Sequence, residues 1–425
     1  MTDSDIQPYK ISVPDSKVDR LKQKLDLYDL PTELSVSESP PWERGPPIAD
    51  ISRLARYWRN GYDWRKHEAR LNATLPQFMT TIILENFGTY DIHFVHAKAE
   101  GVNEENAIPL LFAHGWPGSF LEVSKILPLL VNGDGKASPR FHVVAPSLVD
   151  FGFSGPSLKA GFTVKQHGEI CHQLMLKLGY DQYVVQGGDL GYGIARYLAL
   201  TYPSHCVAHH INLALPGKPT ADKHPDLHAK IQSTPLTDWE KRGLARGSRH
   251  EKSGGGYMAI QSTRPQTIGI ALAASPVALL AWIYDKLHSW TDGYDWTDDE
   301  ILTWISIYEF STAGPAGSLK IYFDENNSSD GPPFFWTCGQ EYSHGSKLGI
   351  SRFPAELSLP PKLWHHIMGE VVLMKEHDKG GHFAAWEVPD ALVGDLREMF
   401  GRGGGAEGVV KGRSGYDERR KEEAK

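Results

Sequence analysis

Residues 183–202 of this chain, YVVQGGDLGYGIARYLALTY, predict a short apolar strand, an abrupt turn and a helix in direct succession. Gly187 and Gly191 stand two positions before and two positions after Asp189, where a strand that bends sharply into a helix leaves no room for side chains. The first N–H groups of the helix would point at the residue in the turn. This pattern is typical of a nucleophile elbow, although Gly and Asp are also common in ordinary turns.

An aspartate at the nucleophile position favours one kind of chemistry. A carboxylate is already ionised at pH 7, because its ordinary pKa is about 3.9, so Asp189 needs no base for a first attack. It suits displacement at a saturated carbon, which gives an alkyl ester of the enzyme that water must then hydrolyse. The sequence therefore predicts a hydrolase that works through a covalent ester on Asp189.

Short apolar runs alternate with helical patterns through much of the chain. The runs IPLLFAH, FHVVAPSL, YVVQGGD and VAHHINLAL are typical of strands buried on both faces, and strand patterns resume at LGISRF and GEVVLMKE. Strands that alternate with helices predict an α/β fold with a mostly parallel central sheet flanked by helices. After VAHHINLAL the alternation stops, and helical segments rich in Trp and Tyr predict an inserted lid.

The same patterns divide the chain into five segments. We expect an N-terminal wrapping segment that runs into the first strands, the first half of the core, a helical lid, the second half of the core, and a tail. In that order they span residues 1–106, 107–216, 217–330, 331–400 and 401–425. The tail is Gly-rich and then charged, so we expect it to be disordered. In the first segment, Asp15 or Ser16 is expected to cap a helix.

Composition argues against several classes of protein. The formal net charge of −8, with no dense patch of Lys and Arg, argues against a nucleic-acid partner. Cys171, Cys206 and Cys338 do not form a disulfide framework or a CxxC metal site, so we expect buried thiols in a reducing compartment. The N-terminus lacks the apolar run of a signal peptide, and no stretch approaches the roughly 20 apolar residues of a membrane span. We therefore expect a soluble, cytoplasmic protein without a membrane anchor.

A second turn motif, HGWPG, follows the apolar run IPLLFA, and its Gly115 and Pro117 end the strand. In folds with a nucleophile elbow, one oxyanion donor comes from the loop after such a strand and the other from the residue after the nucleophile. We therefore expect the backbone N–H groups of Trp116 and Leu190 to form the oxyanion hole. His114 is expected to be structural rather than catalytic. A plain Gly/Pro turn is the simpler alternative for this motif.

Near the C-terminus, the sequence DKGGHF places His382 in a glycine-led loop after the last predicted strand. Where the chain order is nucleophile, acid and histidine, His382 is the candidate base. The acid should follow a strand between Asp189 and His382, and Glu356, just after LGISRF, fits; Asp378 is closer in sequence but lies on the same loop as His382. The other histidines show no HExxH or other ligand spacing, so neither a metal nor an organic cofactor is expected.

These motifs resemble those of the microsomal-type epoxide hydrolases of the α/β-hydrolase superfamily, and their fungal soluble members in particular. The resemblance extends over roughly residues 6 to 400. YWRNGYDWRKHEARLNATLPQF resembles the N-terminal epoxide hydrolase segment that wraps around the core in that family, and HGWPGS and GGDLG resemble its oxyanion and nucleophile motifs. GGHFAAWEVPD resembles its base loop, and FPAEL resembles its acid segment, which implies Glu356. The resemblance implies an α/β-hydrolase fold with an inserted helical lid.

The resemblance also implies two lid tyrosines that hold and protonate the epoxide oxygen, which spacing alone could not select. GYMAIQSTRPQTIG resembles the first such segment and places one at Tyr257, and IYFDENN resembles the second and places the other at Tyr322, with Tyr308 as the nearest competitor. Most tyrosines simply pack in the core with a satisfied hydroxyl. One departure is visible: Val149-Asp150 stands where the family usually has Pro-Gly, which bears on substrate preference rather than on the catalytic set.

The resemblance implies an epoxide hydrolase whose partners are a small-molecule epoxide and water and whose product is a vicinal diol, in detoxification or natural-product metabolism. A haloalkane dehalogenase, which also uses an Asp nucleophile, is one rival, but it commonly has Trp directly after the nucleophile, where Leu190 stands. A catalytically inert binding protein is a second rival, against which the intact Asp189, Glu356 and His382 argue. A homodimer is the default assembly.

Overall fold

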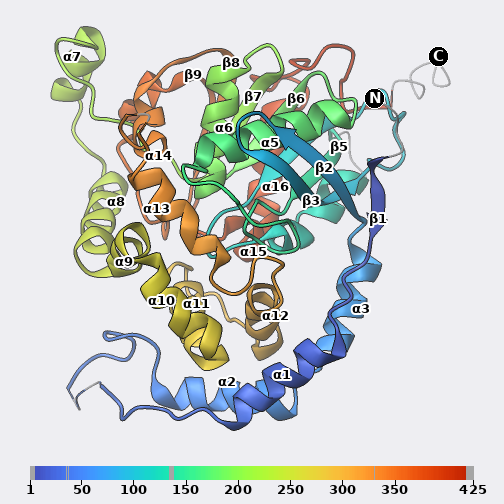
Figure 1. Cartoon of the computed structure of the whole chain (residues 1–425). Coiled ribbons are helices and arrows are strands. Elements are labelled where there is room, and N and C mark those ends of the chain that lie inside the picture. The colour runs from blue at the N-terminus through green and yellow to red at the C-terminus, as the bar shows by residue number, and fades with distance from the viewer. Residues whose placement is uncertain (1–4, 35, 37, 134–137, 330, 418–425) are drawn as a thin grey trace.

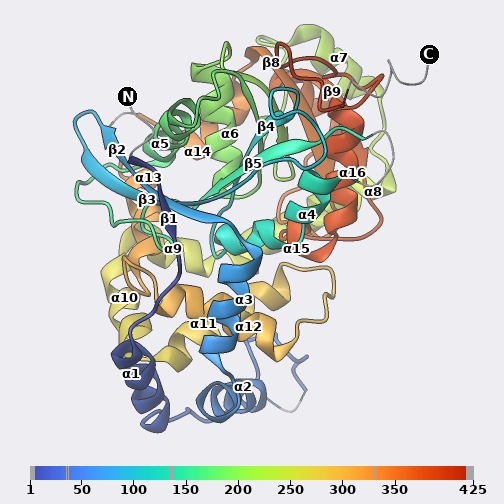
Figure 2. The same ribbon diagram turned by 90° about the vertical axis from the view of Figure 1, so that its right-hand side faces the viewer.

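The computed structural model describes residues 5–34, 36, 38–133, 138–329 and 331–417. Within these residues the centre of the molecule is a nine-stranded sheet. Its strands are β1 (Gln7–Tyr9), β2 (Gln77–Leu84), β3 (Gly88–Ala97), β4 (Ile108–Ala113), β5 (Phe141–Pro146), β6 (Tyr183–Gly187), β7 (Cys206–Ile211), β8 (Ser343–Arg352) and β9 (Gly369–Glu376). They lie side by side in the order β1-β2-β3-β5-β4-β6-β7-β8-β9. Figure 1 labels all of them except β4, which is labelled in Figure 2.

The sheet is mixed, with its antiparallel part at one edge. β1, β2, β3 and β5 pair antiparallel in that order, whereas every neighbouring pair from β5 to β9 is parallel. All residues of β4, β5, β6 and β7 are buried, because helices cover both faces of the sheet at these strands. This burial explains why their sequences are continuous apolar runs, and the predicted α/β fold with a mostly parallel sheet is confirmed.

Helices from the core segments cover the two faces of the sheet (Figure 2). α5 and α6 pack against each other on one face, and α4 and α16 lie on the other, beside β5 and β9. The bounds of the core helices are α4 (Leu127–Asn132), α5 (Val164–Lys177), α6 (Leu190–Thr201), α15 (Ala384–Glu387) and α16 (Pro389–Phe400). Shorter turns are η2 (Phe120–Ser124), η4 (Gly317–Leu319), η5 (Cys338–Gln340) and η6 (Lys362–Ile367), with a π-helical turn η3 (His250–Gly254).

A block of helices is inserted between β7 and β8, and its central members lie below the sheet in Figure 1. These helices are α7 (Pro225–Ser233), α8 (Asp238–Arg249), α9 (Gly256–Thr263), α10 (Pro265–Ala274), α11 (Pro276–Ser289), α12 (Asp298–Glu309), α13 (Lys320–Asn326) and α14 (Phe334–Thr337). α9 packs against α13, and α10 against α11. We call residues 217–330 the lid, as in the sequence analysis; they include α7 to α13, and α14 follows the lid.

The N-terminal segment reaches both the sheet and the lid. Its first strand, β1, pairs with β2 at the sheet edge. Its helices are α1 (Asp15–Asp26), α2 (Ile48–Asn60) and α3 (Trp64–Thr74). α1 and α2 pack on α11, and α2 and α3 on α12, so this segment covers the side of the lid that faces away from the sheet (Figure 2).

The expected side-chain cap of α1 is wrong. Pro14 occupies the N-cap position, and no side chain caps the helix there. Asp15 is the first residue of the helix, and its carboxylate pairs instead with the guanidinium of Arg65 at 2.5 Å.

The expectation of a disordered tail is wrong for residues 401–417. Ala406, Val410 and Tyr416 are buried against the core, and the N–H of Arg140 donates to the carbonyl of Gly415 at 2.9 Å. The glycines allow close turns, and a few apolar side chains anchor these turns to the core. A prediction from overall composition does not detect so few anchors. The charged residues 418–425 lie outside the described residues.

No single helix in the described part of the chain is both long and apolar enough to cross a membrane. The helices α10 and α11 together meet the length and composition criteria, but they are bent by 116° relative to each other. The cysteines Cys171, Cys206 and Cys338 are free and buried.

Candidate active site

Asp189 lies in the turn between β6 and α6, in a conformation that few residues adopt. Its φ is 51° and its ψ is −126°. A Cβ added at Gly187 would lie 2.2 Å from the carbonyl oxygen of Gly191, and one added at Gly191 would lie 1.9 Å from that of Ala113. Both glycines are therefore required by close backbone packing, and the strained residue between them is held at the end of β6.

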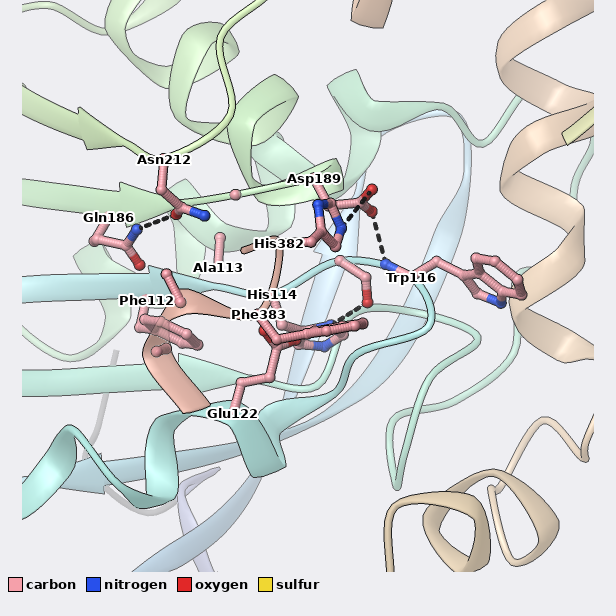
Figure 3. A pocket seen from close by; sticks show the side chains of 14 residues that line it. Phe112, Ala113, His114, Trp116, Glu122, Gln186, Asp189, Asn212, His382 and Phe383 are labelled. Atoms are coloured by element: carbon pink, nitrogen blue, oxygen red, sulfur yellow. Dashed lines mark hydrogen bonds and ion pairs between the residues drawn. The ribbon is translucent and has the colours of Figure 1, made fainter. Parts of the chain in front are cut away.

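The HGWPG loop meets the carboxylate of Asp189 directly. The backbone N–H of Trp116 donates to Oδ1 of Asp189 at 2.7 Å (Figure 3). A Cβ on Gly115 would lie 2.2 Å from the same oxygen, so only glycine lets the carboxylate approach the loop. Leu190, the other expected oxyanion donor, is the first residue of α6 and lines a cavity together with Asp189.

Buried side chains fix the HGWPG loop in place. The Nε2 atom of His114 accepts the N–H of Leu148 at 3.1 Å, and burial lowers the pKa of His114 to about 4, so its ring is neutral. The hydroxyl of Tyr308 donates to the carbonyl of Gly118 at 2.6 Å. Tyr308 therefore holds this loop through its hydroxyl, unlike Tyr257 and Tyr322. The hydrogen bond of His114 fits the structural role expected for it.

His382 lies between the carboxylates of Asp189 and Glu356. Its Nδ1 donates to Oε1 of Glu356 at 2.7 Å, and its Nε2 lies 3.4 Å from Oδ2 of Asp189. Glu356 is fully buried, whereas Asp378 is exposed in the turn after β9. The structure thus brings Asp189, His382 and Glu356 together and leaves Asp378 apart.

The lid and α15 hold the loop that carries His382. The N–H of His382 donates to the carbonyl of Trp290 at 2.9 Å, and the two rings meet edge to face with centroids 5.0 Å apart. A carboxylate oxygen of Asp292 accepts the N–H of Gly380 at 3.0 Å, and one of Glu387 accepts the N–H of Phe383 at 3.1 Å. The position of the imidazole therefore depends on the lid as well as on the core.

The two carboxylates set the charge of the imidazole. Burial alone would lower the pKa of His382, but the charges of Glu356 and Asp189 and their hydrogen bonds outweigh it and raise this pKa well above 6.5. His382 is therefore an imidazolium while Asp189 is ionised. Loss of the negative charge on Asp189 would remove one of these two charges and lower the pKa of His382.

Tyr257 of α9 and Tyr322 of α13 face Asp189 across a cavity. Their ring centroids are 6.0 Å apart, and the indole of Trp116 stacks on Tyr257 at 5.1 Å and meets Tyr322 edge to face at 5.7 Å. All three of Asp189, Tyr257 and Tyr322 line this cavity. Burial, strengthened by the charge of Asp189, raises the pKa of both phenols well above 10, so each keeps its proton as a hydrogen-bond donor.

The cavity above Asp189 has a volume of about 110 Å³, and a wider groove of about 1030 Å³ between lid and core adjoins it. The cavity walls are mostly apolar. Residues that line both spaces include Leu215, His250, Met258, Trp336 and Leu357. A molecule bound in the cavity would therefore meet a mostly apolar surface beside Asp189.

A smaller cavity of about 20 Å³ lies behind the nucleophile, and sequence reasoning did not find its polar lining residues Glu122, Gln186 and Asn212 (Figure 3). Nε2 of Gln186 donates to Oδ1 of Asn212 at 2.8 Å. None of the three belongs to a spaced motif, so only their place in the fold reveals them. No group of three His, Cys, Asp or Glu side chains in the described ranges is arranged to hold a metal ion.

Asp150 lies outside these cavities and ties the core to the lid. Its φ is 69°, its carboxylate accepts the N–H of Ser157 at 3.0 Å, and it pairs with Nζ of Lys320 at 2.8 Å. Lys320 begins α13, two residues before Tyr322. Asp150 therefore contacts the N-terminal end of α13, the helix that carries Tyr322.

The chain is similar to known proteins over most of its length. A family model described as the epoxide hydrolase N terminus matches residues 6–123, and one described as the alpha/beta hydrolase fold matches residues 108–227. A protein of Stigmatella aurantiaca with a provisional epoxide hydrolase name is 38% identical over 407 residues, which cover 93% of this chain and 84% of that protein. Epoxide hydrolase 1 of Sus scrofa is 32% identical over 421 residues, which cover 94% of this chain and 89% of that protein.

A solved structure agrees with these sequence matches. The structure of Aspergillus niger epoxide hydrolase superposes with a TM-score of 0.77 at 33% identity, and the match covers 92% of this chain and 94% of that chain. The similarity therefore includes the N-terminal segment, the core and the lid together.

Proposed function

Since this chain belongs to the epoxide hydrolases, we propose that Asp189, His382 and Glu356, with the phenols of Tyr257 and Tyr322, carry out its conversion of an epoxide and water into a vicinal diol. The observation that carries this assignment is the pair of contacts made by the Asp189 carboxylate. Its Oδ1 accepts a hydrogen bond from the N–H of Trp116 at 2.7 Å, and its Oδ2 lies 3.4 Å from Nε2 of His382. A nucleophile, an oxyanion donor and a base thus meet at one side chain.

Ring opening comes first in the proposed reaction. A carboxylate oxygen of Asp189 attacks one carbon of the oxirane, and the bond from that carbon to the ring oxygen breaks. The electron pair stays on the ring oxygen, which takes a proton from Tyr257 or Tyr322. A phenol, with an ordinary pKa of about 10, is a suitable donor to a developing alkoxide. The products are an alkyl ester of Asp189 and a phenolate, which the proton of the His382 imidazolium restores to a phenol.

Hydrolysis of the ester follows. Neutral His382, oriented by Glu356, takes a proton from water while the water oxygen adds to the Asp189 carbonyl carbon. The oxyanion forms where Trp116 and Leu190 supply N–H groups, and losing one such donor costs about 3–4 kcal/mol in comparable reactions. The bond from the carbonyl carbon to the alkyl oxygen then breaks, and the leaving oxygen takes a proton from His382. The new carboxylic acid returns a proton to His382, which restores the resting enzyme.

The test is to stop the reaction between these steps. In His382→Gln, which lacks the base, we expect an epoxide such as styrene oxide to add to Asp189 and remain there as an ester. Mass spectrometry of the digested protein would find the mass of the substrate on the peptide that contains Asp189. Diol formed at the wild-type rate without an ester on this peptide would contradict the assignment. Chloride release from a chloroalkane, with no diol from any epoxide, would contradict the reaction itself.

The apolar walls of the cavity favour an apolar epoxide as the substrate. A panel of small aryl and bulky alkyl epoxides would rank candidates, and preference for a bulky, highly functionalised epoxide would favour natural-product metabolism over detoxification. The three free, buried thiols fit a reducing compartment, so we include a cytoplasmic location in the proposal, to be checked by fractionation. We also include a homodimer, to be checked by light scattering.

A further inference from the structure

The small cavity behind Asp189 differs in kind from the apolar cavity in front of it. Its volume of about 20 Å³ is enough for one water molecule, which needs roughly 10–15 Å³. It touches both partners of the hydrolysis step, Asp189 and His382, and its wall includes the polar side chains of Glu122, Gln186 and Asn212. A buried water generally bonds to two to four polar groups, and this lining offers that number.

Glu122 lines this cavity and has a side-chain oxygen that can still accept a hydrogen bond. Its side chain rises from η2 below Asp189 and His382 (Figure 3) and is buried. Its Oε1 has no hydrogen-bond partner among the residues that the structure describes. A Cβ on Gly118 would lie 1.7 Å from that oxygen, so the glycine of the HGWPG loop makes room for it.

A buried carboxyl oxygen without a hydrogen-bond partner destabilises the fold, because it loses its hydration and no protein group replaces the lost water. Such atoms are rare in folded proteins and usually have a water or a function as their explanation. Here the residue that carries the unpartnered oxygen also lines the water-sized cavity.

We propose that Glu122 holds the water that hydrolyses the Asp189 ester, and so acts as a positioning residue for the second half of the reaction. The inference rests on the proposed function, because it assumes the ester. The water donates one hydrogen bond to Oε1 of Glu122 and the other to Nε2 of His382, which takes that proton as the oxygen adds to the Asp189 carbonyl carbon. Glu122 itself neither gains nor loses a proton.

The protonation state of Glu122 suits this role. Burial raises its pKa to about 8; the charge of His382 lowers this pKa and that of Asp189 raises it. Neither charge is present when Asp189 is an ester and His382 is neutral, so burial, the largest cause of the raised pKa, keeps the pKa of Glu122 high in the intermediate. Glu122 is then mostly protonated at pH 7, and no negative carboxylate opposes the oxyanion that forms on Asp189.

Two variants separate this role from a structural one. Glu122→Leu keeps the approximate volume but removes both polar atoms, whereas Glu122→Gln keeps a neutral group with an acceptor and a donor. Single turnovers with styrene oxide are followed by rapid quench and mass spectrometry, which give the rate of ester formation and the rate of ester hydrolysis separately. Glu309→Gln is the matched control, because Glu309 is another carboxyl with an unpartnered buried oxygen, but it contacts Lys24 and lines neither cavity at Asp189.

We expect Glu122→Leu to hydrolyse the ester at least tenfold more slowly than the wild type and to form it within threefold of the wild-type rate. Glu122→Gln should retain hydrolysis within threefold at pH 7. In the wild type, hydrolysis should slow as the pH rises past about 8, where Glu122 ionises, and Glu122→Gln should lack this decline. Glu309→Gln should match the wild type in both steps.

Hydrolysis at the wild-type rate in Glu122→Leu would overturn the inference, as would an equal loss in both steps. If Glu122→Leu does not fold, the pH profile decides: an alkaline decline in Glu122→Gln identical to that of the wild type would overturn the inference. If the wild type itself forms no ester, the proposed function fails; if it forms the ester and only the Glu122 variants behave otherwise than stated, the inference about Glu122 alone fails.

Discussion

The core side and the lid side of the active site are built in different ways. On the core side, Asp189 and Trp116 lie in tight turns at the ends of β6 and β4. Gly115, Gly187 and Gly191 pack so closely in these turns that an added Cβ would lie less than 2.5 Å from another atom, so the backbone has little freedom to move. On the lid side, Tyr257 and Tyr322 lie on helices that meet through aromatic contacts. The core site is thus determined by local backbone geometry, and the lid site by how distant helices pack.

This difference also divides the proposed chemistry. The core groups form the ester and hydrolyse it, whereas the phenols act on the epoxide oxygen and have no part in attack by water. Substitutions on the core side should therefore abolish turnover or trap the ester, and those on the lid side should slow ring opening while hydrolysis of a formed ester continues. Variants that mixed these effects would break the comparison.

The largest effect is expected at the nucleophile. Asp189→Ala removes the group that bonds to carbon, so diol formation from styrene oxide should fall by about 10⁴-fold or more, as for other covalent nucleophiles. The assay is chromatographic measurement of the diol. Asp378→Ala, in the exposed turn after β9, is the control and should keep the wild-type rate. A comparable loss of diol formation in both variants would contradict the role of Asp189 as the nucleophile.

Loss of a lid phenol should have a smaller effect. Tyr257→Phe and Tyr322→Phe each remove one of two donors to the ring oxygen, so ester formation should slow by about 10- to 100-fold in each and further in the double variant. Rapid-quench measurements should show ester hydrolysis within threefold of the wild type. Tyr284→Phe is the control, because Tyr284 is a buried tyrosine of α11 whose ring meets that of Trp42 edge to face. Slower hydrolysis with unchanged ring opening would contradict the division between lid and core.

The charge coupling between Asp189 and His382 can be measured without substrate. The carboxylates raise the pKa of His382 above 6.5 against the effect of burial, so removing one charge in Asp189→Ala should lower that pKa. The imidazole would then be protonated only at lower pH than in the wild type. NMR titration of the histidine ring protons, with His382→Gln to assign the signal, gives both values. An unchanged or higher pKa in Asp189→Ala would show that Asp189 does not control the base.

The smallest effect is expected where the two sides are joined. Asp150→Gly relieves a positive φ but removes the contact with Lys320 at the start of α13, so we expect a less than tenfold fall in kcat/KM. The free energy of unfolding should change by no more than about 1 kcal/mol, because Lys320 is partly exposed. Lys320→Met should have the same effect, and the double variant should add nothing. Additive losses would mean that the two residues act separately.

The same contrast explains what could be predicted from the sequence. The fold followed from apolar runs such as those at β4 and β6, and Asp189, Trp116 and His382 could be nominated because a turn of glycines has few alternatives. Tyr257 and Tyr322 could not be chosen from 17 tyrosines without a family resemblance, because helix packing decides which of them face Asp189. Glu122 gave no signal, since one acidic residue in a short helical turn is ordinary until its surroundings are known. The tail at 401–417 was misjudged because its anchors are only a few apolar side chains among glycines.

The most direct test of the account follows one oxygen atom. Enzyme in excess of an epoxide is allowed a single turnover in water enriched in oxygen-18, and the diol and the peptide that contains Asp189 are both weighed by mass spectrometry. Because water attacks the carbonyl carbon of the ester, the account predicts an unlabelled diol and one heavy oxygen on Asp189. A labelled diol with an unlabelled Asp189 would mean that water attacks the epoxide directly, and the covalent role of Asp189 would have to be abandoned.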